Sequence, residues 1–226
     1  MLPDLSAIFS RYEALAAEAD ALFARVRELH PDCVVCEQGC SDCCHAMFDL
    51  SLVEAMYLNQ KFAAAIPFGK QRSDLLTRAS ETDRQLTRLK RQMFQDSKKG
   101  KSADEIMDAV ARLRMPCPLL EAGSCLLYAY RPVTCRLYGI PLNIHGKGHV
   151  CGKTGFSAGQ SVPAVQMERI QDRLEGLSRD IAQAVNSRFD ELHQVYVPVS
   201  MALLTRYDAA YLGVKGEGAG ARKGED

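Results

Sequence analysis

The sequence predicts a mainly α fold, in which a helical bundle carries an irregular, cysteine-rich metal-binding cap with short strands. Apolar residues recur at steps of three and four along several long segments, which is the spacing of amphipathic helices. Residues 114–155 are instead rich in proline and glycine, which argues against long helices there. All nine cysteines fall into two widely separated groups, which we expect to meet in space: Cys33, Cys36, Cys40, Cys43 and Cys44, then Cys117, Cys125, Cys135 and Cys151.

Length and composition indicate an ordinary globular chain. With 226 residues it suits one domain, and we assign residues 1–212 to a single cysteine-cluster metal-binding domain. The glycine-rich, charged tail at 213–226 is predicted to be disordered. The formal net charge is zero, so overall charge indicates no polyanion or membrane partner.

The expected compartment favours metal over disulfides. We find neither an apolar run of membrane-spanning length nor the basic flank and apolar stretch of a signal peptide, so we expect a cytoplasmic protein. In a reducing compartment, clustered cysteines bind metal more often than they pair. An odd total of nine also fits poorly with complete pairing.

Three helices are predicted in the first half of the chain. The first covers residues 4–29, with Asp4 as its cap. Ser51 and Glu54 have the spacing of a capping box, which opens a second helix that runs to about residue 65. The third lies within residues 70–101, which hold ten Lys or Arg and four Asp or Glu. We expect a solvated helix face there and no nucleic-acid partner.

A short fourth helix should precede the proline- and glycine-rich segment. Within that segment we expect a strand at 125–128, one helical turn opened by Pro132, and a hairpin at 142–150. With few long apolar stripes, the segment should form little core of its own.

The C-terminal helices are predicted within residues 163–210. The longest apolar stripe of the chain runs over residues 163–192 and predicts one long helix. A last helix should follow Pro198 and include Tyr211.

The short cysteine loop at 33–45 favours an iron–sulfur cluster of the 4Fe–4S type, with zinc as the alternative. Thiolates are soft ligands that suit zinc, iron–sulfur clusters or copper(I). Two Cys-x2-Cys pairs of a structural zinc site are usually a dozen or more residues apart, whereas three residues separate them here. Many thiolates in one short loop are more typical of iron–sulfur ligation.

The neighbouring Cys43 and Cys44 sharpen this interpretation. Adjacent side chains diverge, so the two are awkward ligands for one ion; they would serve two centres, or one would be buried as a small apolar residue. The spacing Cys36-x3-Cys40-x2-Cys43 also occurs in radical S-adenosylmethionine enzymes. Those enzymes need a barrel of alternating strands and helices, for which this chain is too short.

Residues 33–151 resemble the YkgJ-type cysteine-cluster family, which is described as a zinc- or iron-chelating domain. The resemblance is carried by the Cys-Cys loop, by Cys117-Pro-Leu-Leu, by the signature Cys125-Leu-Leu-Tyr-Ala-Tyr-Arg-Pro-Val-Thr-Cys135-Arg, and by a final Cys151. The family's first motif is usually tighter than the one here, which leaves open whether Cys33 or Cys36 is the ligand.

The resemblance implies a metal-binding protein without implying a reaction. Our leading hypothesis is a structural or electron-transfer role, with all nine cysteines as candidate ligands. Flagellin lysine N-methylases carry a similar cysteine domain, so a metal-cluster-containing, protein-modifying enzyme is the alternative. No Gly-rich cofactor loop is evident, and neither a catalytic residue nor a protein partner is assigned.

Charged and aromatic residues near the cysteines have supporting roles in this interpretation. Arg131 and Arg136 would offset the negative charge of several thiolates, although Arg131 would equally suit a nearby carboxylate. Tyr128 is either a core residue or a hydroxyl donor to sulfur. His45 and His149 flank the cysteine groups and could be ligands, but we expect them at the surface or around the ligands. Asp42 and Asp49 are near the site and are expected to be solvated.

Overall fold

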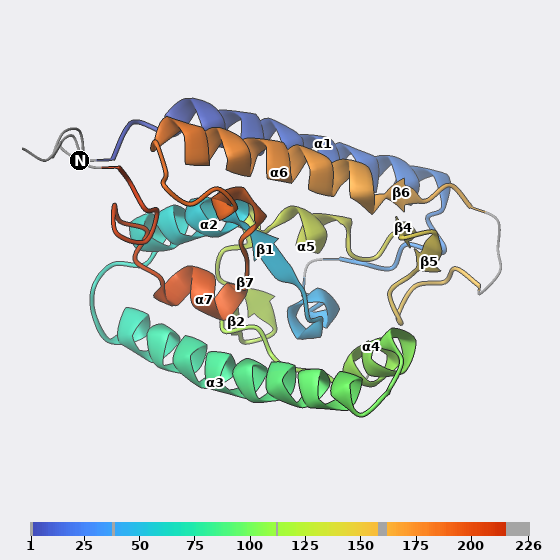
Figure 1. The fold of residues 1–226 in the computed structure, drawn as a ribbon. Helices are drawn as coiled ribbons and strands as arrows, with labels where there is room; N and C mark the ends of the chain where they lie inside the picture. Colours follow the sequence, from blue (N-terminus) through green and yellow to red (C-terminus); the bar gives the residue numbers. More distant parts are fainter. Residues whose placement is uncertain (1, 38, 112, 158–161, 216–226) are drawn as a thin grey trace, which may run out of the picture.

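The computed structural model describes residues 2–37, 39–111, 113–157 and 162–215. The fold is mainly α with a few short strands, as the apolar spacing predicted (Figure 1). The α-helices are α1 (Ser6–Leu29), α2 (Leu52–Ala65), α3 (Lys70–Lys98), α4 (Ala103–Ala111), α5 (Val133–Leu137), α6 (Met167–Ala184) and α7 (Val199–Leu204). Within the described ranges, no helix is both long and apolar enough to cross a membrane.

The strands are short and form three small sheets. They are β1 (Asp49–Ser51), β2 (Leu120–Glu121), β3 (Ser124–Cys125), β4 (Leu142–Ile144), β5 (Lys147–His149), β6 (Val165–Gln166) and β7 (Tyr196–Pro198). β1 pairs with β7 and β2 with β3, both antiparallel, while β4 lies between antiparallel β5 and parallel β6. Single 3-10 turns complete the list: η1 (Asp42–His45), η2 (Tyr128–Tyr130) and η3 (Leu192–Gln194).

Two apolar clusters form the core, and α2 contributes to both. α1 and α6 lie side by side, and α2 packs against them (Figure 1). Tyr12, Val53 and Ile181 belong to the first cluster, between these helices. The second cluster lies between α2, α3 and α7 and includes Phe62 and Leu75. α2 therefore joins the two halves of the bundle.

The helices in the first half of the chain begin and end close to their predicted bounds. α1 starts at Ser6, two residues later than predicted. Its N-cap residue is Leu5 and not Asp4, although the Asp4 carboxylate accepts a hydrogen bond from the Ser6 N–H at 2.9 Å. The capping box at α2 is present, since the Glu54 N–H donates to the Ser51 side chain and the Glu54 carboxylate accepts from the Ser51 N–H.

The prediction of one long helix over residues 163–192 is wrong at both ends, because α6 covers only Met167–Ala184. Val165 and Gln166 form strand β6 against β4, and α6 ends at Ala184. Asn186 takes a left-handed conformation with φ of 49°, which asparagine tolerates better than most residues. The N–H groups of Asn186 and Ser187 then bond back to the last turn of the helix, in the pattern of a Schellman motif.

The last helix is also shorter than predicted. α7 ends at Leu204, so Tyr211 lies outside it. The Asp208 carboxylate accepts hydrogen bonds from the N–H groups of Ala210 and Tyr211, which stabilises a turn in place of a helix.

Only the first three residues of the predicted tail, 213–215, belong to the described residues. The carbonyl of Gly213 accepts from the N–H of Arg188, and Val214 forms a β-bridge with Ser187, so residues 213–215 are held by the fold. The remaining tail, residues 216–226, lies outside the described residues.

Residues 114–155 contain no long helix, as predicted, but they bury more apolar surface than expected. The strand predicted at 125–128 is only β3, because residues 128–130 form the turn η2. The single helical turn is α5, for which Pro132 is the cap, and the hairpin is β4–β5. Six side chains of the segment belong to the two clusters: Leu119, Leu127, Val133, Leu137, Ile140 and Leu142.

The buried Glu54 carboxylate connects α2 to α5. One of its oxygens accepts from the Ser51 N–H and hydroxyl at 3.0 and 2.8 Å, and the other accepts from the Val133 N–H at 3.1 Å. Burial raises the pKa of Glu54, against the opposing effect of these hydrogen bonds. One side chain therefore satisfies backbone groups at the starts of two helices.

Replacing Glu54 with alanine should destabilise the protein, because it leaves the Ser51 and Val133 N–H groups buried without partners. We expect the free energy of unfolding, measured by urea denaturation, to fall by about 3 kcal/mol. Glu81→Ala, on an exposed position of α3, is the control and should change it by less than about 0.5 kcal/mol. Equal stability of the two variants would contradict the proposed link between α2 and α5.

Candidate metal centre

The two cysteine groups, far apart in the sequence, meet in space as expected. The N–H of Cys117 donates to the carbonyl of Cys44 at 2.7 Å. At the other end of the first group, the Cys33 carbonyl accepts from the Gly155 N–H at 2.8 Å and from the Thr154 hydroxyl at 2.9 Å. The cysteine loop is thus held by backbone hydrogen bonds to both ends of segment 114–155.

Five cysteines line one cavity of about 260 Å³, which we call the large thiol cavity: Cys43, Cys44, Cys117, Cys125 and Cys135. Three parts of the fold bring them together. η1 carries Cys43 and Cys44, the segment that follows α4 and includes β3 carries Cys117 and Cys125, and α5 carries Cys135. Burial raises the pKa of Cys117 to about 12 and that of Cys135 well above its usual value, and the charges of neighbouring thiolates add to both shifts.

Three further cysteines lie with Cys43 around a hollow of about 10 Å³, which we call the small thiol hollow: Cys36, Cys40 and Cys151. The hollow has room for about one water-sized sphere. Burial, followed by the neighbouring Cys40 and Cys43, raises the pKa of Cys36 to about 11. Burial likewise raises the pKa of Cys151 to about 11.

Cys43 lines both the large thiol cavity and the small thiol hollow. A hydrogen bond from the Cys44 thiol, together with the charge of Arg131, lowers the pKa of Cys43. The same hydrogen bond, with burial, raises the pKa of Cys44. Of the two neighbouring cysteines, Cys43 is therefore the one that ionises first, and it stands between the two sets of sulfurs.

Cys33 is set apart from the other eight cysteines. Its side chain is half-buried against the first apolar cluster, and it lines neither the large thiol cavity nor the small thiol hollow. Cys36, by contrast, lies with Cys40 and Cys151. The sequence left open whether Cys33 or Cys36 is the ligand. The geometry favours Cys36 as the candidate ligand.

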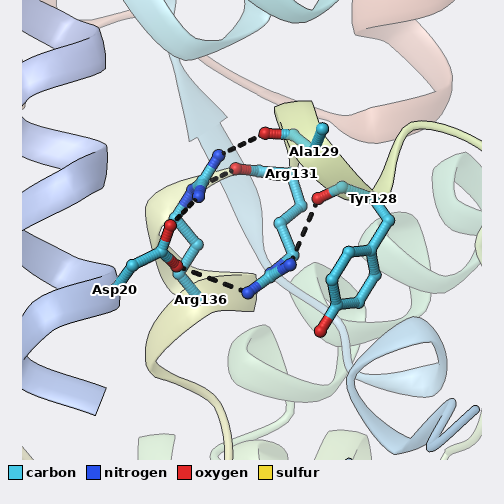
Figure 2. A network of polar contacts seen from close by, with 5 residues as sticks. All are labelled: Asp20, Tyr128, Ala129, Arg131 and Arg136. Atoms are coloured by element: carbon cyan, nitrogen blue, oxygen red, sulfur yellow. Dashed lines mark hydrogen bonds and ion pairs between the residues drawn. The ribbon is translucent and has the colours of Figure 1, made fainter. Parts of the chain in front are cut away.

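A network of polar contacts holds the two arginines next to the large thiol cavity. Figure 2 shows the Asp20 carboxylate of α1 between the guanidinium groups of Arg131 and Arg136. The buried Arg136 also donates to the carbonyls of Arg131 and Ala129, at 2.8 and 2.7 Å. Arg131 donates to the Tyr128 carbonyl and lies over the Tyr128 ring, with 3.9 Å from its central carbon to the ring centre.

Arg131 has both of the roles considered from the sequence. It pairs with a carboxylate, Asp20, at 3.3 Å. It also lines the large thiol cavity, and its charge favours the ionised forms of Cys43 and Cys125, in opposition to the effect of burial on the pKa of Cys125. Tyr128 was expected to be a core residue or a hydroxyl donor to sulfur. It is instead 48% exposed, and its ring packs against the Arg131 guanidinium.

Asp42 was expected to be solvated and is instead buried, with 5% of its surface exposed. Its carboxylate accepts from Arg114 at 2.6 Å, from the Cys151 thiol at 3.1 Å and from the Tyr138 hydroxyl at 3.3 Å. Burial opposes ionisation, but these hydrogen bonds outweigh it and lower the pKa of Asp42. The partners come from three distant positions, so no local sequence signal marks this residue.

Of the other polar candidates, the two histidines lie outside both spaces, whereas Asp49 lines the large thiol cavity. The Nδ1 atom of His45 lies 2.9 Å from the Ser41 carbonyl oxygen, and His149 is exposed on β5. Asp49 pairs with Lys90 of α3 at 2.8 Å. Among the residues that line the large thiol cavity and the small thiol hollow, neither histidine is present.

The nine sulfurs form a set of free thiols in this structure. All nine cysteines belong to the described residues, and none is in a disulfide. Across the described ranges, no group of three or more Cys, His, Asp or Glu side chains is arranged to hold a metal ion. Comparisons of the chain with protein-family models, with curated proteins and with solved structures find no match.

Arg131→Gln should make Cys43 less reactive, because loss of the cation raises the pKa of the thiol and lowers its thiolate fraction. In chelator-treated protein at neutral pH, we expect iodoacetamide to alkylate Cys43 several-fold more slowly than in the unmodified protein. The rate is measured by mass spectrometry of the peptide that contains Cys43.

Two control variants separate charge from packing in this experiment. Arg131→Lys keeps the charge and should retain most of the reactivity of Cys43. Lys90→Gln removes a cation that lines the same cavity but is paired with Asp49, and it should leave the rate unchanged. Equal rates for Arg131→Gln and Lys90→Gln would show that Arg131 does not act on Cys43.

Proposed function

We propose that this protein binds metal through its clustered cysteine thiolates, with a structural or electron-transfer role. The observation that carries the proposal is the gathering of eight cysteines, from two distant segments, around two adjoining spaces that share Cys43. Segments 33–45 and 114–155 would then form the metal-binding cap of the helical bundle. The resemblance of residues 33–151 to the YkgJ-type cysteine-cluster family supports the same function.

The chemistry of the donors fits a soft metal. Sulfur is the common donor of both spaces, and buried thiols are kept neutral by their raised pKa values until a cation replaces their protons. In the large thiol cavity the ligands would come from Cys44, Cys117, Cys125 and Cys135, together with Cys43. In the small thiol hollow they would come from Cys36, Cys40 and Cys151.

An iron–sulfur cluster of the 4Fe–4S type is the group we favour, with zinc as the alternative. Five cysteines line the large thiol cavity, and a 4Fe–4S cluster or a tetrahedral zinc ion would each take four of them. The preference for the cluster rests on the short loop at 33–45, which holds many close thiolates. When bound, such a cluster would supply one-electron transfer, and zinc would supply a cross-link between the two segments. Arg131 adds a positive charge beside the thiolates, which offsets part of the negative charge that ligation would create.

Anaerobic purification followed by metal and acid-labile sulfide analysis tests the proposal. For one such cluster we expect about four iron and about four sulfide per chain and a brown solution. For the zinc alternative we expect about one zinc per chain and a colourless solution. A protein that contains neither metal after anaerobic purification would refute the proposed function.

Serine substitutions of single cysteines test which sulfurs are ligands. Cys135→Ser removes one thiol of the large cavity and should lower the metal content several-fold, while helical circular dichroism is largely retained. Cys33→Ser is the matched control, because Cys33 lines neither space, and it should keep the metal of the unmodified protein. Loss of metal in both variants, or in neither, would contradict this division of the cysteines.

A further inference from the structure

The large thiol cavity extends well beyond its sulfurs into an apolar chamber. Four parts of the fold supply most of its remaining walls. They are the chain before β1, the inner face of α3, the residues around Pro116, and the junction of β7 and α7. Among the apolar side chains that line it are Met47, Phe48, Leu86, Met93, Met115 and Val199.

Each charged side chain that the described residues contribute to this cavity is already paired within the protein. Lys90 pairs with Asp49 at 2.8 Å, and both line the cavity. Arg131 pairs with Asp20 at 3.3 Å. A charged ligand would therefore have to break an internal ion pair or lose its hydration without compensation, which is costly in an apolar space. An uncharged ligand meets neither cost.

The volume and the methionines indicate the size and the kind of ligand. A dry cavity of about 150 Å³ holds one benzene molecule, so a cavity of about 260 Å³ has room for a bicyclic aromatic or an alkyl chain of similar volume. Met47, Met93 and Met115 are unbranched and polarizable, so they adapt to the shape of an apolar ligand and contact aromatic rings favourably.

We propose that the large thiol cavity is a binding site for a small, uncharged apolar molecule, held by its methionine-lined chamber next to the cysteines. The proposal does not require a metal. If the proposed metal centre is present, this site would bring an apolar ligand next to it, and the protein would be more than a carrier of a structural ion.

A pair of fluorescent probes tests the preference for uncharged ligands. 1-Naphthylamine is a bicyclic aromatic that is neutral at pH 7, whereas 1-naphthylamine-8-sulfonate has the same rings and a sulfonate. With the full-length protein as purified anaerobically, we expect the neutral probe to bind with a dissociation constant on the order of 10 µM. The sulfonate should bind at least about tenfold more weakly, and naphthalene should displace the neutral probe. Equal affinities for both probes would overturn the proposal.

Neighbouring residues of α3 provide a matched pair of variants. Met93 lines the cavity, whereas Phe94 is 61% exposed on the outer side of the helix. Met93→Trp should fill the chamber and weaken binding of the neutral probe at least about tenfold, while Phe94→Trp should leave it unchanged. Met115→Trp serves as a second filling variant if Met93→Trp does not fold, as judged by circular dichroism. Retained binding in a folded filling variant would place the probe elsewhere and overturn the proposal.

The metal content of the same samples separates this proposal from the proposed function. If the anaerobically purified protein contains no metal and still binds the neutral probe, the absence of metal refutes the metal-binding function and the binding supports the cavity site. Binding that occurs only after the metal has been removed from a metal-containing sample would mean that the chamber is simply the space of the metal centre, and the proposal would fail. Equal binding before and after chelation would support it.

Discussion

The buried guanidinium group of Arg136 is the interaction on which the placement of the second cysteine segment depends. Its three nitrogens donate to the carbonyls of Arg131 and Ala129 and to the carboxylate of Asp20. A buried cation that loses its acceptors costs several kcal/mol, so other conformations of this segment are strongly disfavoured. Because Asp20 belongs to α1, the network holds α5 against a long helix of the bundle. Cys135 is adjacent to Arg136 and is therefore held at the large thiol cavity.

The same carboxylate orients a second cation toward the sulfurs. Asp20 pairs with Arg131, whose guanidinium also lies over the ring of Tyr128 and so is held from two sides. Its charge favours the thiolate of Cys43, which stands between the two sets of cysteines. Burial acts in the opposite direction on most of the other thiols, which remain neutral until a cation compensates them. Under the proposed function, Cys43 would therefore be the first point of attachment for a metal ion.

Polarity divides the surroundings of the cysteines into two unlike spaces. The small thiol hollow is bordered by a buried carboxylate, Asp42, that accepts three hydrogen bonds. The large thiol cavity is bordered mainly by methionine and other apolar side chains, and its ion pairs are complete. A metal bound in the hollow would have an acidic neighbour, whereas one bound in the cavity would face an apolar chamber. The two spaces therefore suit different chemistry although they share Cys43.

The sequence by itself determined the helical elements and the association of the two cysteine groups. Apolar periodicity is local, so it located α1 and α2 to within about two residues. It failed at the end of α6, where the backbone conformation of Asn186 ends a helix whose apolar spacing continues. Only the tertiary structure decided that Cys33 stands apart, that Asp42 is buried and that the thiols divide between two spaces. Each of these depends on contacts between residues far apart in the chain, and no local spacing encodes such contacts.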